Sequence, residues 1–338
     1  MTTTPSQPLV SVLIPTFNGA RRIGETLDSI LIQTTESLAE QIEIVVSDNA
    51  STDDTEAVIR HYQGVSKIPI IYARHPENMG YDVNVDSLFQ RSTGKYVWTL
   101  ADDDTLRPGA LSRVLTAITL QPDLSAILVN FVAYDADLEE VRDAVAISDD
   151  ILCWTPEDFI TRAESKYSLL SALIFHKEAW LHAEKAAGYG SNFIHVYALF
   201  KILRTGSSLI IAEPMVNYRQ GSTNFGVSGD SILRTGLSAC AVVNSMESMG
   251  YDRTLPRMLL KKSRRYIYGL VIASKLAGIQ EKLHIAGKLI SFYPTPTVFL
   301  KLIPVIFLPD RLFLTMYQIR KSTTRWLQNL KRRIFQSH

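Results

Sequence analysis

Three consecutive carboxylates, Asp102, Asp103 and Asp104, directly follow an apolar segment of the chain. Adjacent like charges repel one another, and a solvated turn would need only one of them. The acid run therefore indicates a positively charged partner, with a solvated acidic turn as the alternative. Alternation along a strand would place Asp102 and Asp104 on one face, but we expect the chain to leave its strand at this point.

The elements that must position these acids alternate between strand and helix patterns over the first half of the chain. Short apolar, β-branched runs predict buried strands, and apolar residues at helical spacing predict the helices between them. The predicted strands are 9–15, 42–47, 68–73 and 96–100, and the predicted helices are 23–31, 53–62, a part of 82–90, and 108–118 with Pro108 in its first turn. This alternation predicts an α/β fold with a doubly wound, mostly parallel sheet.

Polar residues gather at one end of these strands. Ligands of such sheets bind beyond the carboxyl ends of the strands. Residues 16–18 follow the first strand, Asp48 follows the second, and the acid run follows the fourth. We therefore expect one ligand crevice, although Asp48 could merely open a turn and Asp53 is expected to cap a helix.

The second half of the chain shows a less regular pattern. It predicts a strand over 169–175, a helix over 194–203 and extended segments at 210–212 and 215–218. Residues 219–230 are rich in Gly, Ser and Asn and are expected to form a mobile loop. Residues 257–276 predict a helix with a basic flank.

An ordered set of motifs resembles the inverting family 2 glycosyltransferases. These motifs are VSVLIPTFN, VSDNASTDDT, NMG, and the acid run followed by RPGAL. The resemblance is strong over about residues 9–120 and fainter over 165–225. It implies a GT-A fold and the transfer, with inversion, of a hexosyl or deoxyhexosyl group from a nucleoside-diphosphate sugar to a saccharide acceptor.

The resemblance also implies how the donor is bound. Asp48 would read the nucleobase, the residues after the first strand would pack around the nucleoside, and the Asn78–Gly80 turn would approach the nucleotide, unless it is a plain turn. The implied donor-binding residues are Pro15, Thr16, Phe17, Asn18, Asp48, Asn78, Gly80, Asp82, Asn84 and Asp102.

The acid run matches the family's metal motif with one gap. The usual spelling is Asp-x-Asp-Asp, three further residues, then Pro-Gly, so counting back from Pro108 places Ala101 at the first acid. The resemblance implies Mg²⁺ or Mn²⁺ on the donor diphosphate, and hard oxygen ligands fit both ions. We expect Asp103 to be a direct metal ligand and Asp104 a second, with Asp102 on ribose, water or metal.

The position of the family's catalytic base also carries a different residue type. An inverting transferase needs a base to deprotonate the acceptor hydroxyl, and aligning the helix over 198–203 with the family places His195 where the family has Asp. Imidazole, with an ordinary pKa of ~6.5, is a competent base. A structural histidine is the alternative, with Asn192 or a distant carboxylate as base. Arg219 resembles the family's Tyr-Arg-x-x-x-Ser region, which implies stabilisation of developing phosphate charge.

Composition and the chain ends suggest where the protein works. The formal net charge of +1 argues against bulk nucleic-acid binding. Two cysteines form no disulfide framework, which favours a reducing compartment. We expect no signal peptide and no spanning helix, because no uninterrupted apolar run reaches ~18 residues. A cytoplasmic location is therefore expected.

The C-terminal segment, about 292–338, is apolar, broken by prolines and then strongly basic. This pattern favours binding at an anionic membrane surface; a helix packed on the core is the alternative. We expect a GT-A domain at 1–230, with a donor half at about 9–120 and an acceptor half at 121–230, followed by a helical region at 231–338.

The gap at Ala101, the histidine at 195 and the motif SDNASTD together resemble a subgroup close to the abequosyltransferases, which add a dideoxyhexose to a lipid-linked O-antigen unit. This implies an enzyme of surface polysaccharide biosynthesis, peripheral on the inner face of the cell membrane. Two other classes stay open. One is a non-catalytic nucleotide-sugar-binding protein, because both positions depart from the family. The other is a nucleotidyltransferase, although residues 16–19 do not form the Gly-rich loop expected of one.

Overall fold

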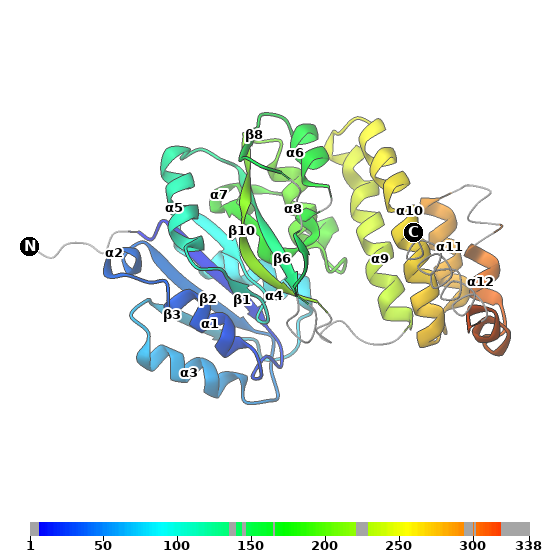
Figure 1. Ribbon diagram of the computed structural model, residues 1–338, viewed down its shortest axis with the longest axis horizontal. Coiled ribbons are helices and arrows are strands. Elements are labelled where there is room, and N and C mark those ends of the chain that lie inside the picture. Colours follow the sequence, from blue (N-terminus) through cyan, green and yellow to red (C-terminus); the bar gives the residue numbers. More distant parts are fainter. Residues whose placement is uncertain are drawn as a thin grey trace, which may run out of the picture. The chain divides into compact units, whose positions relative to one another are not determined.

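A computed structural model of the chain describes residues 7–134, 140–143, 147–164, 166–220, 229–293, 300 and 302–318. The chain divides into two compact units, Met1–Asn224 and Phe225–His338. The first contains the sheet and the helices packed on it, and the second is helical (Figure 1).

The first unit is built on a 10-stranded sheet, counted over the described residues. Its main path runs β3-β2-β1-β4-β9-β6-β10-β5, with β7 paired to β6 and β8 paired to β10. The strands are β1 Val10–Thr16, β2 Ile42–Asp48, β3 Ile70–Arg74, β4 Tyr96–Thr99, β5 Thr105–Leu106, β6 Ala126–Tyr134, β7 Glu140–Asp143, β8 Ile151–Cys153, β9 Leu173–His176 and β10 Ser208–Arg219.

The long strand pairings are parallel. β1 lies between β2 and β4, and β3 extends this parallel set beyond β2. Every residue of β1 and β2 is buried, which explains why both strands are continuous apolar runs. β9 runs antiparallel between β4 and β6 and so joins this set to the parallel pair of β6 and β10. The predicted α/β fold with a mostly parallel sheet is confirmed.

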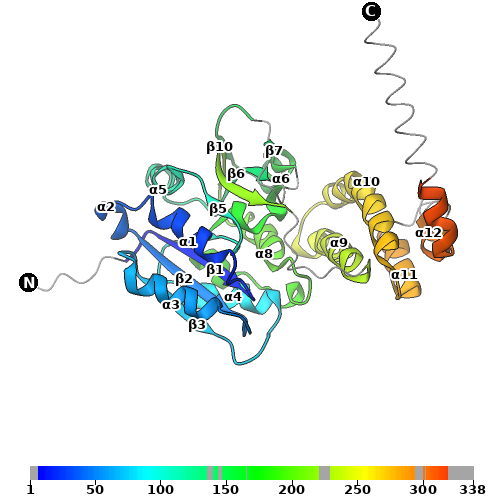
Figure 2. The same cartoon turned by 60° about the horizontal axis from the view of Figure 1, so that its bottom comes forward.

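The helices of the first unit pack in groups on the sheet (Figures 1 and 2). α1 contacts α3, whereas α4 contacts β1, β2, α7 and α8. The helices are α1 Ile23–Leu31, α2 Glu36–Ala39, α3 Thr55–Val65, α4 Tyr81–Arg91, α5 Ala110–Leu120, α6 Pro156–Ala163, α7 Lys177–His182 and α8 Ile194–Ile202.

Two predicted elements need correction. The predicted strand over 169–175 becomes a strand only at Leu173, because Leu170–Ala172 forms a 3-10 turn. The predicted helix at 108–118 begins at Ala110, because Gly109 precedes it with a left-handed φ of 85°. Pro108 therefore lies before the helix. The predicted loop at 219–230 falls mostly outside the described residues; Arg219 ends β10 and α9 begins at Gly229.

The second unit confirms the predicted helical C-terminal region. It contains α9 Gly229–Asn244, α10 Thr254–Ala277, α11 Lys282–Phe292 and α12 Ile303–Phe307. Buried apolar side chains from all four helices share one core, among them Leu237, Val271, Leu289 and Ile306. Within the described residues, no helix combines the length and the apolar character needed to cross a membrane.

Candidate active site

The carboxyl ends of β1, β2 and β4 bring the predicted residues together. Thr16 pairs with Asp48 across the β1–β2 register. The Thr16 hydroxyl donates a 2.5 Å hydrogen bond to Asp102 Oδ2. A β-carbon at position 19 would lie 2.4 Å from both oxygens of this bond, so Gly19 is the residue that lets the loop after β1 approach the acid run.

The three acids of the run have different partners. Asp102 is held by Thr16, and Asp104 accepts hydrogen bonds from the Ser171 hydroxyl at 2.5 Å and from the Arg219 amide at 2.9 Å. Asp103 Oδ2 is buried and has no hydrogen-bond partner among the described residues. Asp103 therefore keeps a buried carboxylate oxygen that is available to a ligand.

Burial and mutual repulsion perturb the flanking acids. Burial, with a contribution from the Asp103 carboxylate, raises the pKa of Asp102 to about 7. The same two causes raise the pKa of Asp104 to about 8. A cation at Asp103 would oppose both rises, because a nearby positive charge favours the ionised carboxylate.

A pocket of about 330 Å³ opens at Asp103. Its lining residues are Glu25, Asp103, Thr105, Tyr134, Asn217, Tyr218 and Arg219. Within the described residues, no group of three or more His, Cys, Asp or Glu side chains is placed to hold a metal. A hard cation can nevertheless be bound through one or two carboxylates plus substrate phosphates and water. The unpartnered Asp103 oxygen fits such a cation.

Arg219, at the end of β10, reaches this pocket. Its Nη2 lies 2.5 Å from Glu25 Oε2, and its Nε donates to the Asp103 carbonyl oxygen over 3.4 Å. The predictions did not include Glu25, or Ser171 on the other side of the acid run. Both are far from their partners in sequence, and no motif marks either.

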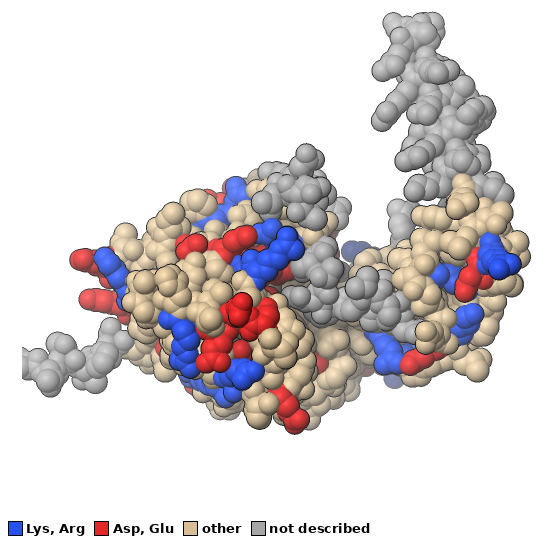
Figure 3. Space-filling view, turned by 90° about the horizontal axis from the view of Figure 1, so that it is seen from below, with Lys and Arg blue, Asp and Glu red and all other residues tan. Residues whose placement is uncertain are grey.

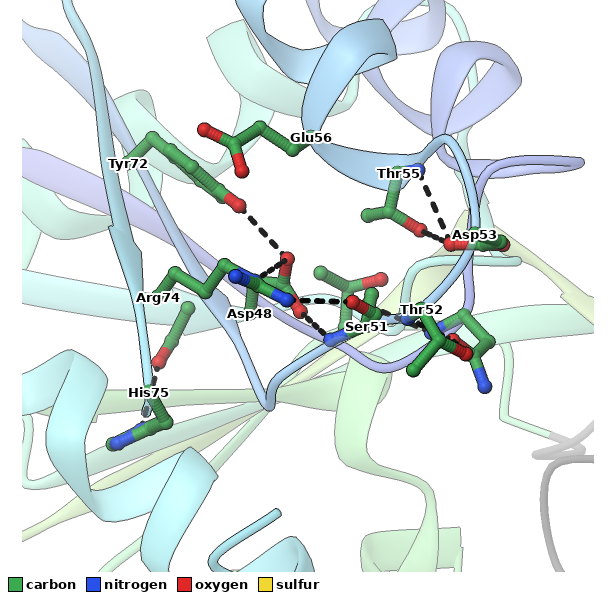
Figure 4. A network of polar contacts seen from close by, with 12 residues as sticks. Asp48, Ser51, Thr52, Asp53, Thr55, Glu56, Tyr72, Arg74 and His75 are labelled. Atoms are coloured by element: carbon green, nitrogen blue, oxygen red, sulfur yellow. Dashed lines mark hydrogen bonds and ion pairs between the residues drawn. The ribbon is translucent and has the colours of Figure 1, made fainter. Parts of the chain in front are cut away.

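Asp48 is fully buried at the end of β2 (Figure 4). Its Oδ1 accepts the Ser51 amide and its Oδ2 accepts the Tyr72 hydroxyl, both at 2.8 Å, and Arg74 Nε lies 3.7 Å from Oδ2. Burial, followed by the hydrogen bond to Asp48, raises the pKa of Tyr72. The structure therefore places Asp48 at the carboxyl end of β2 with both carboxylate oxygens already engaged by neighbouring residues.

The loop after β1 is fixed by the loop after β2. Asn18, with a φ of 54°, accepts the Thr52 amide on its side-chain oxygen at 2.8 Å. Asp53 accepts the Ala20 and Thr55 amides, each at 3.1 Å, so it joins this loop to the start of α3 (Figure 4). Pro15 is buried within β1, whereas the Phe17 side chain is 39% exposed.

The turn before α4 is built on Asn49, which the sequence predicts to lie beside Asp48 at the end of the second strand. Asn49 donates to the Asn78 side-chain oxygen and accepts the Met79 amide, each at 2.8 Å. Gly80 follows with a φ of 83°, a conformation that favours glycine. Asn84, one turn into α4, is buried, and its Oδ1 has no hydrogen-bond partner among the residues that the structure describes.

His195 lies in the first turn of α8 and is 2% exposed. Its Nε2 lies 3.0 Å from the Ser168 carbonyl oxygen, which can only accept, so Nε2 carries the proton. Nδ1 has no hydrogen-bond partner among the described residues. Burial lowers the pKa of His195 to about 4. The ring is therefore neutral at pH 7, with the lone pair on Nδ1.

Asp82, predicted as a donor-binding residue, accepts hydrogen bonds on its side chain from the start of α8. It is buried in the first turn of α4 and accepts the Asn192 amide at 2.9 Å and the Ile194 amide at 3.1 Å. Both amides belong to the start of α8. Within the described contacts, Asp82 therefore faces the helix that carries His195.

Comparison with known proteins identifies the family. Residues 11–178 match the family model described as glycosyl transferase family 2. The chain is 30% identical over 292 residues to the abequosyltransferase RfbV of Salmonella typhimurium, covering 81% of this chain and 86% of that protein. It is 32% identical over 108 residues to the GalNAc(5)-diNAcBac-PP-undecaprenol beta-1,3-glucosyltransferase of Campylobacter jejuni, covering 32% of this chain and 34% of that protein.

Solved structures share the fold at low sequence identity. S. aureus TarS 1-349 in complex with UDP gives a TM-score of 0.55 at 14% identity, covering 91% of both chains. The mannosyltransferase PcManGT from Pyrobaculum calidifontis, in complex with GDP-Man and Mn2+, gives a TM-score of 0.54 at 18% identity, covering 89% of this chain and 86% of that one.

The chain belongs to glycosyltransferase family 2 and has the GT-A fold. The predicted family and glycosyltransferase role are confirmed, and the alternatives of a non-catalytic binding protein and a nucleotidyltransferase are not favoured. The roles of individual site residues stay predictions.

Proposed function

We propose that the chain is an inverting, metal-dependent transferase that moves a hexosyl or deoxyhexosyl group from a nucleoside-diphosphate sugar to a lipid-linked saccharide in surface polysaccharide biosynthesis. The observation that carries this proposal is Asp103, which lines a pocket together with Arg219 and has a buried carboxylate oxygen without a partner in the described part of the chain.

Asp103 would hold a Mg²⁺ or Mn²⁺ ion. Such an ion supplies Lewis-acid neutralisation of the diphosphate that leaves as the glycosidic bond breaks. Asp104 is held by Ser171 and Arg219, and we propose that it supports Asp103 or adds a second ligand. Arg219 would add a positive charge beside the phosphates, once their oxygens compete with Glu25 for its guanidinium.

His195 would act as the base. Its neutral ring has an unpartnered Nδ1 that can accept the proton of the acceptor hydroxyl, and the Nε2–H bond to Ser168 fixes this tautomer. Its lowered pKa makes it a weaker base than free imidazole. Approach of the acceptor to the buried ring would then require a change in the residues around it.

The donor and acceptor classes are proposed from the relatives. One relative is named as an abequosyltransferase and another as acting on an undecaprenol-linked glycan. Two structural neighbours were solved with UDP and with GDP-Man. These names support a nucleoside-diphosphate sugar as donor and a lipid-linked saccharide as acceptor. The nucleobase and the sugar of the donor are determined by a transfer assay with a panel of donors.

A lipid-linked acceptor would present its sugar at a membrane, and we propose that the C-terminal region, about 292–338, binds the inner face of the cell membrane. Lys and Arg side chains lie at several places on the surface of the second unit (Figure 3). On residues 310–318, which are helical, Leu312, Leu314 and Met316 are exposed. Residues 319–338 lie outside the described part of the chain. Exposed apolar side chains beside basic residues suit an anionic surface.

A transfer assay with Asp103→Asn tests the function. Purified full-length chain is supplied with a panel of nucleoside-diphosphate sugars, Mn²⁺ and a lipid-linked acceptor, and product and nucleoside diphosphate are measured. We expect Asp103→Asn to lower turnover about 100-fold or more, because the carboxylate acts where charge develops. Asp123→Asn, on an exposed acid outside the site, is the matched control. Undiminished turnover of the true substrate by Asp103→Asn contradicts the metal assignment.

A further inference from the structure

The N-terminus of α8 receives its cap from another helix. Its own N-cap position, Phe193, makes no side-chain capping bond. Instead each carboxylate oxygen of Asp82 accepts one backbone amide, Oδ2 from Asn192 and Oδ1 from Ile194. A carboxylate at a helix start satisfies amides that lack intrahelical partners, and it interacts favourably with the helix dipole.

The backbone before α8 needs such an anchor. Gly190 has a φ of 81° and Asn192 a φ of 61°, so the chain turns twice through the left-handed region before the helix begins. Burial raises the pKa of Asp82, and the amides of residues 190–192 and 194 oppose that rise. The Asp82 carboxylate is thus buried, and both of its oxygens are hydrogen-bonded to the backbone at the start of α8.

The same end of α4 also contacts His195 and the donor-side turn. The Tyr81 and His195 ring centroids lie 6.1 Å apart in an edge-to-face arrangement. Gly80, the N-cap position of α4, belongs to the turn that Asn49 and Asn78 hold. The N-terminal end of α4 therefore contacts both the donor-side turn and α8, the helix that carries the proposed base.

We propose that Asp82 is a positioning residue that holds the start of α8, and with it His195, and that it makes no contact with the donor. This replaces the donor-binding role predicted from its motif. Its kinetic consequence rests on the proposed function, whereas its effect on the environment of His195 does not.

The informative substitution is Asp82→Asn. It keeps the shape of the side chain but turns one of the two acceptor oxygens into an NH₂ group that faces a backbone N–H. Asp82→Glu, which keeps both acceptors and the charge, is the conservative variant and the fallback if Asp82→Asn does not fold. Thr155→Ala is the matched control, because Thr155 caps α6 by accepting the Asp158 amide at 3.2 Å and lies outside the site.

The first measurement needs no substrate. Deuterium exchange at the imidazole C2 position, read by mass spectrometry on the full chain, reports solvent access and protonation of each histidine. We expect Asp82→Asn to speed exchange at His195 several-fold, Asp82→Glu to restore slow exchange in part, and Thr155→Ala to leave it unchanged. Wild-type exchange at His195 in folded Asp82→Asn overturns the proposal.

The second measurement separates positioning from donor binding. We expect Asp82→Asn to lower kcat about tenfold and to leave unchanged the calorimetric Kd for UDP or GDP with Mn²⁺, whichever the wild type binds. In a His195→Ala background it should cost no further turnover. A raised nucleotide Kd, or a loss that adds fully to that of His195→Ala, overturns the proposal. Absence of transfer by the wild type contradicts the proposed function instead, and the exchange measurement still decides the role of Asp82.

Discussion

At the scale of single residues, the three acids of the run lie in three different environments. Thr16 holds Asp102, while Ser171 and the Arg219 amide hold Asp104. Among the buried carboxylate oxygens of the run, Asp103 Oδ2 is the one without a partner among the described residues. At the position of the missing family acid, the Ala101 amide donates to the same Ser171 hydroxyl that bonds Asp104. Where the family has an acidic side chain, this chain therefore has a backbone hydrogen bond from Ala101 to Ser171.

His195 predicts how stability depends on pH. Its pKa in the folded chain, about 4, lies below the ordinary ~6.5, so between these values the unfolded chain binds the proton and the folded chain does not. Stability is therefore complete above ~6.5 and is lost as the pH falls towards 4, by up to about 3 kcal/mol.

We expect His195→Gln, whose amide can still donate to Ser168, to flatten this dependence. Urea unfolding between pH 7 and 4.5, followed by tryptophan fluorescence, measures it in the first unit, where Trp98 and Trp180 are fully buried. His182→Gln, on a largely exposed histidine, is the control. An unchanged pH slope in His195→Gln would show that the ring is not buried in its neutral form.

Much of the site could be predicted from local sequence, because β1, β2 and β4 end where their polar motifs begin. Thr16, Asp102 and Asp103 follow from that rule. Glu25 and Ser171 could not be predicted, since their partners are set by tertiary packing. Asp82 lies in the expected motif but faces α8, a direction that depends on how α4 packs on α8 and that spacing along the chain does not specify.

At the scale of elements, strands buried on both faces were predictable and strands defined by their partners were not. The sequences of β1 and β2 are uninterrupted apolar runs, and the predicted ends of both strands lie within one or two residues of the observed ends. β5 has two residues and exists through its pairing with β10. β9 starts later than predicted, because the chain first makes the 3-10 turn that presents Ser171 to the acid run.

That turn gives a prediction at the element scale. Ser171→Ala removes the buried hydroxyl that accepts the half-buried Ala101 amide and donates to the buried Asp104 carboxylate. Leaving buried polar groups unpaired should lower the free energy of unfolding by about 1–3 kcal/mol. Urea titration of the variant measures this loss, with Ser248→Ala, on an exposed serine, as the control. A change as small as that of Ser248→Ala would mean that Ser171 does not link the turn before β9 to the acid run.

At the scale of the whole molecule, the net charge of +1 conceals an uneven distribution. α10 carries exposed basic residues at Arg257, Lys261, Lys262 and Arg264, and its sequence holds no acid. Residues 319–338 contain six Lys and Arg and no Asp or Glu. Like charges concentrated at one end of a chain attract anionic surfaces over about a Debye length. The acceptor class proposed above makes a membrane the relevant surface.

We therefore expect the full chain to cosediment with vesicles containing phosphatidylglycerol, and to be released as salt is raised, because screening weakens the attraction. Neutralising Lys331, Arg332 and Arg333 together should weaken binding by about 1 kcal/mol for each charge that contacts the surface. Neutralising Arg60, Lys67 and Arg91, three exposed charges of the first unit, is the matched control and should have little effect. Equal losses in the two triple variants would mean that vesicle binding follows net charge alone. Binding that resists both high salt and the C-terminal substitutions would instead place the contact on apolar side chains.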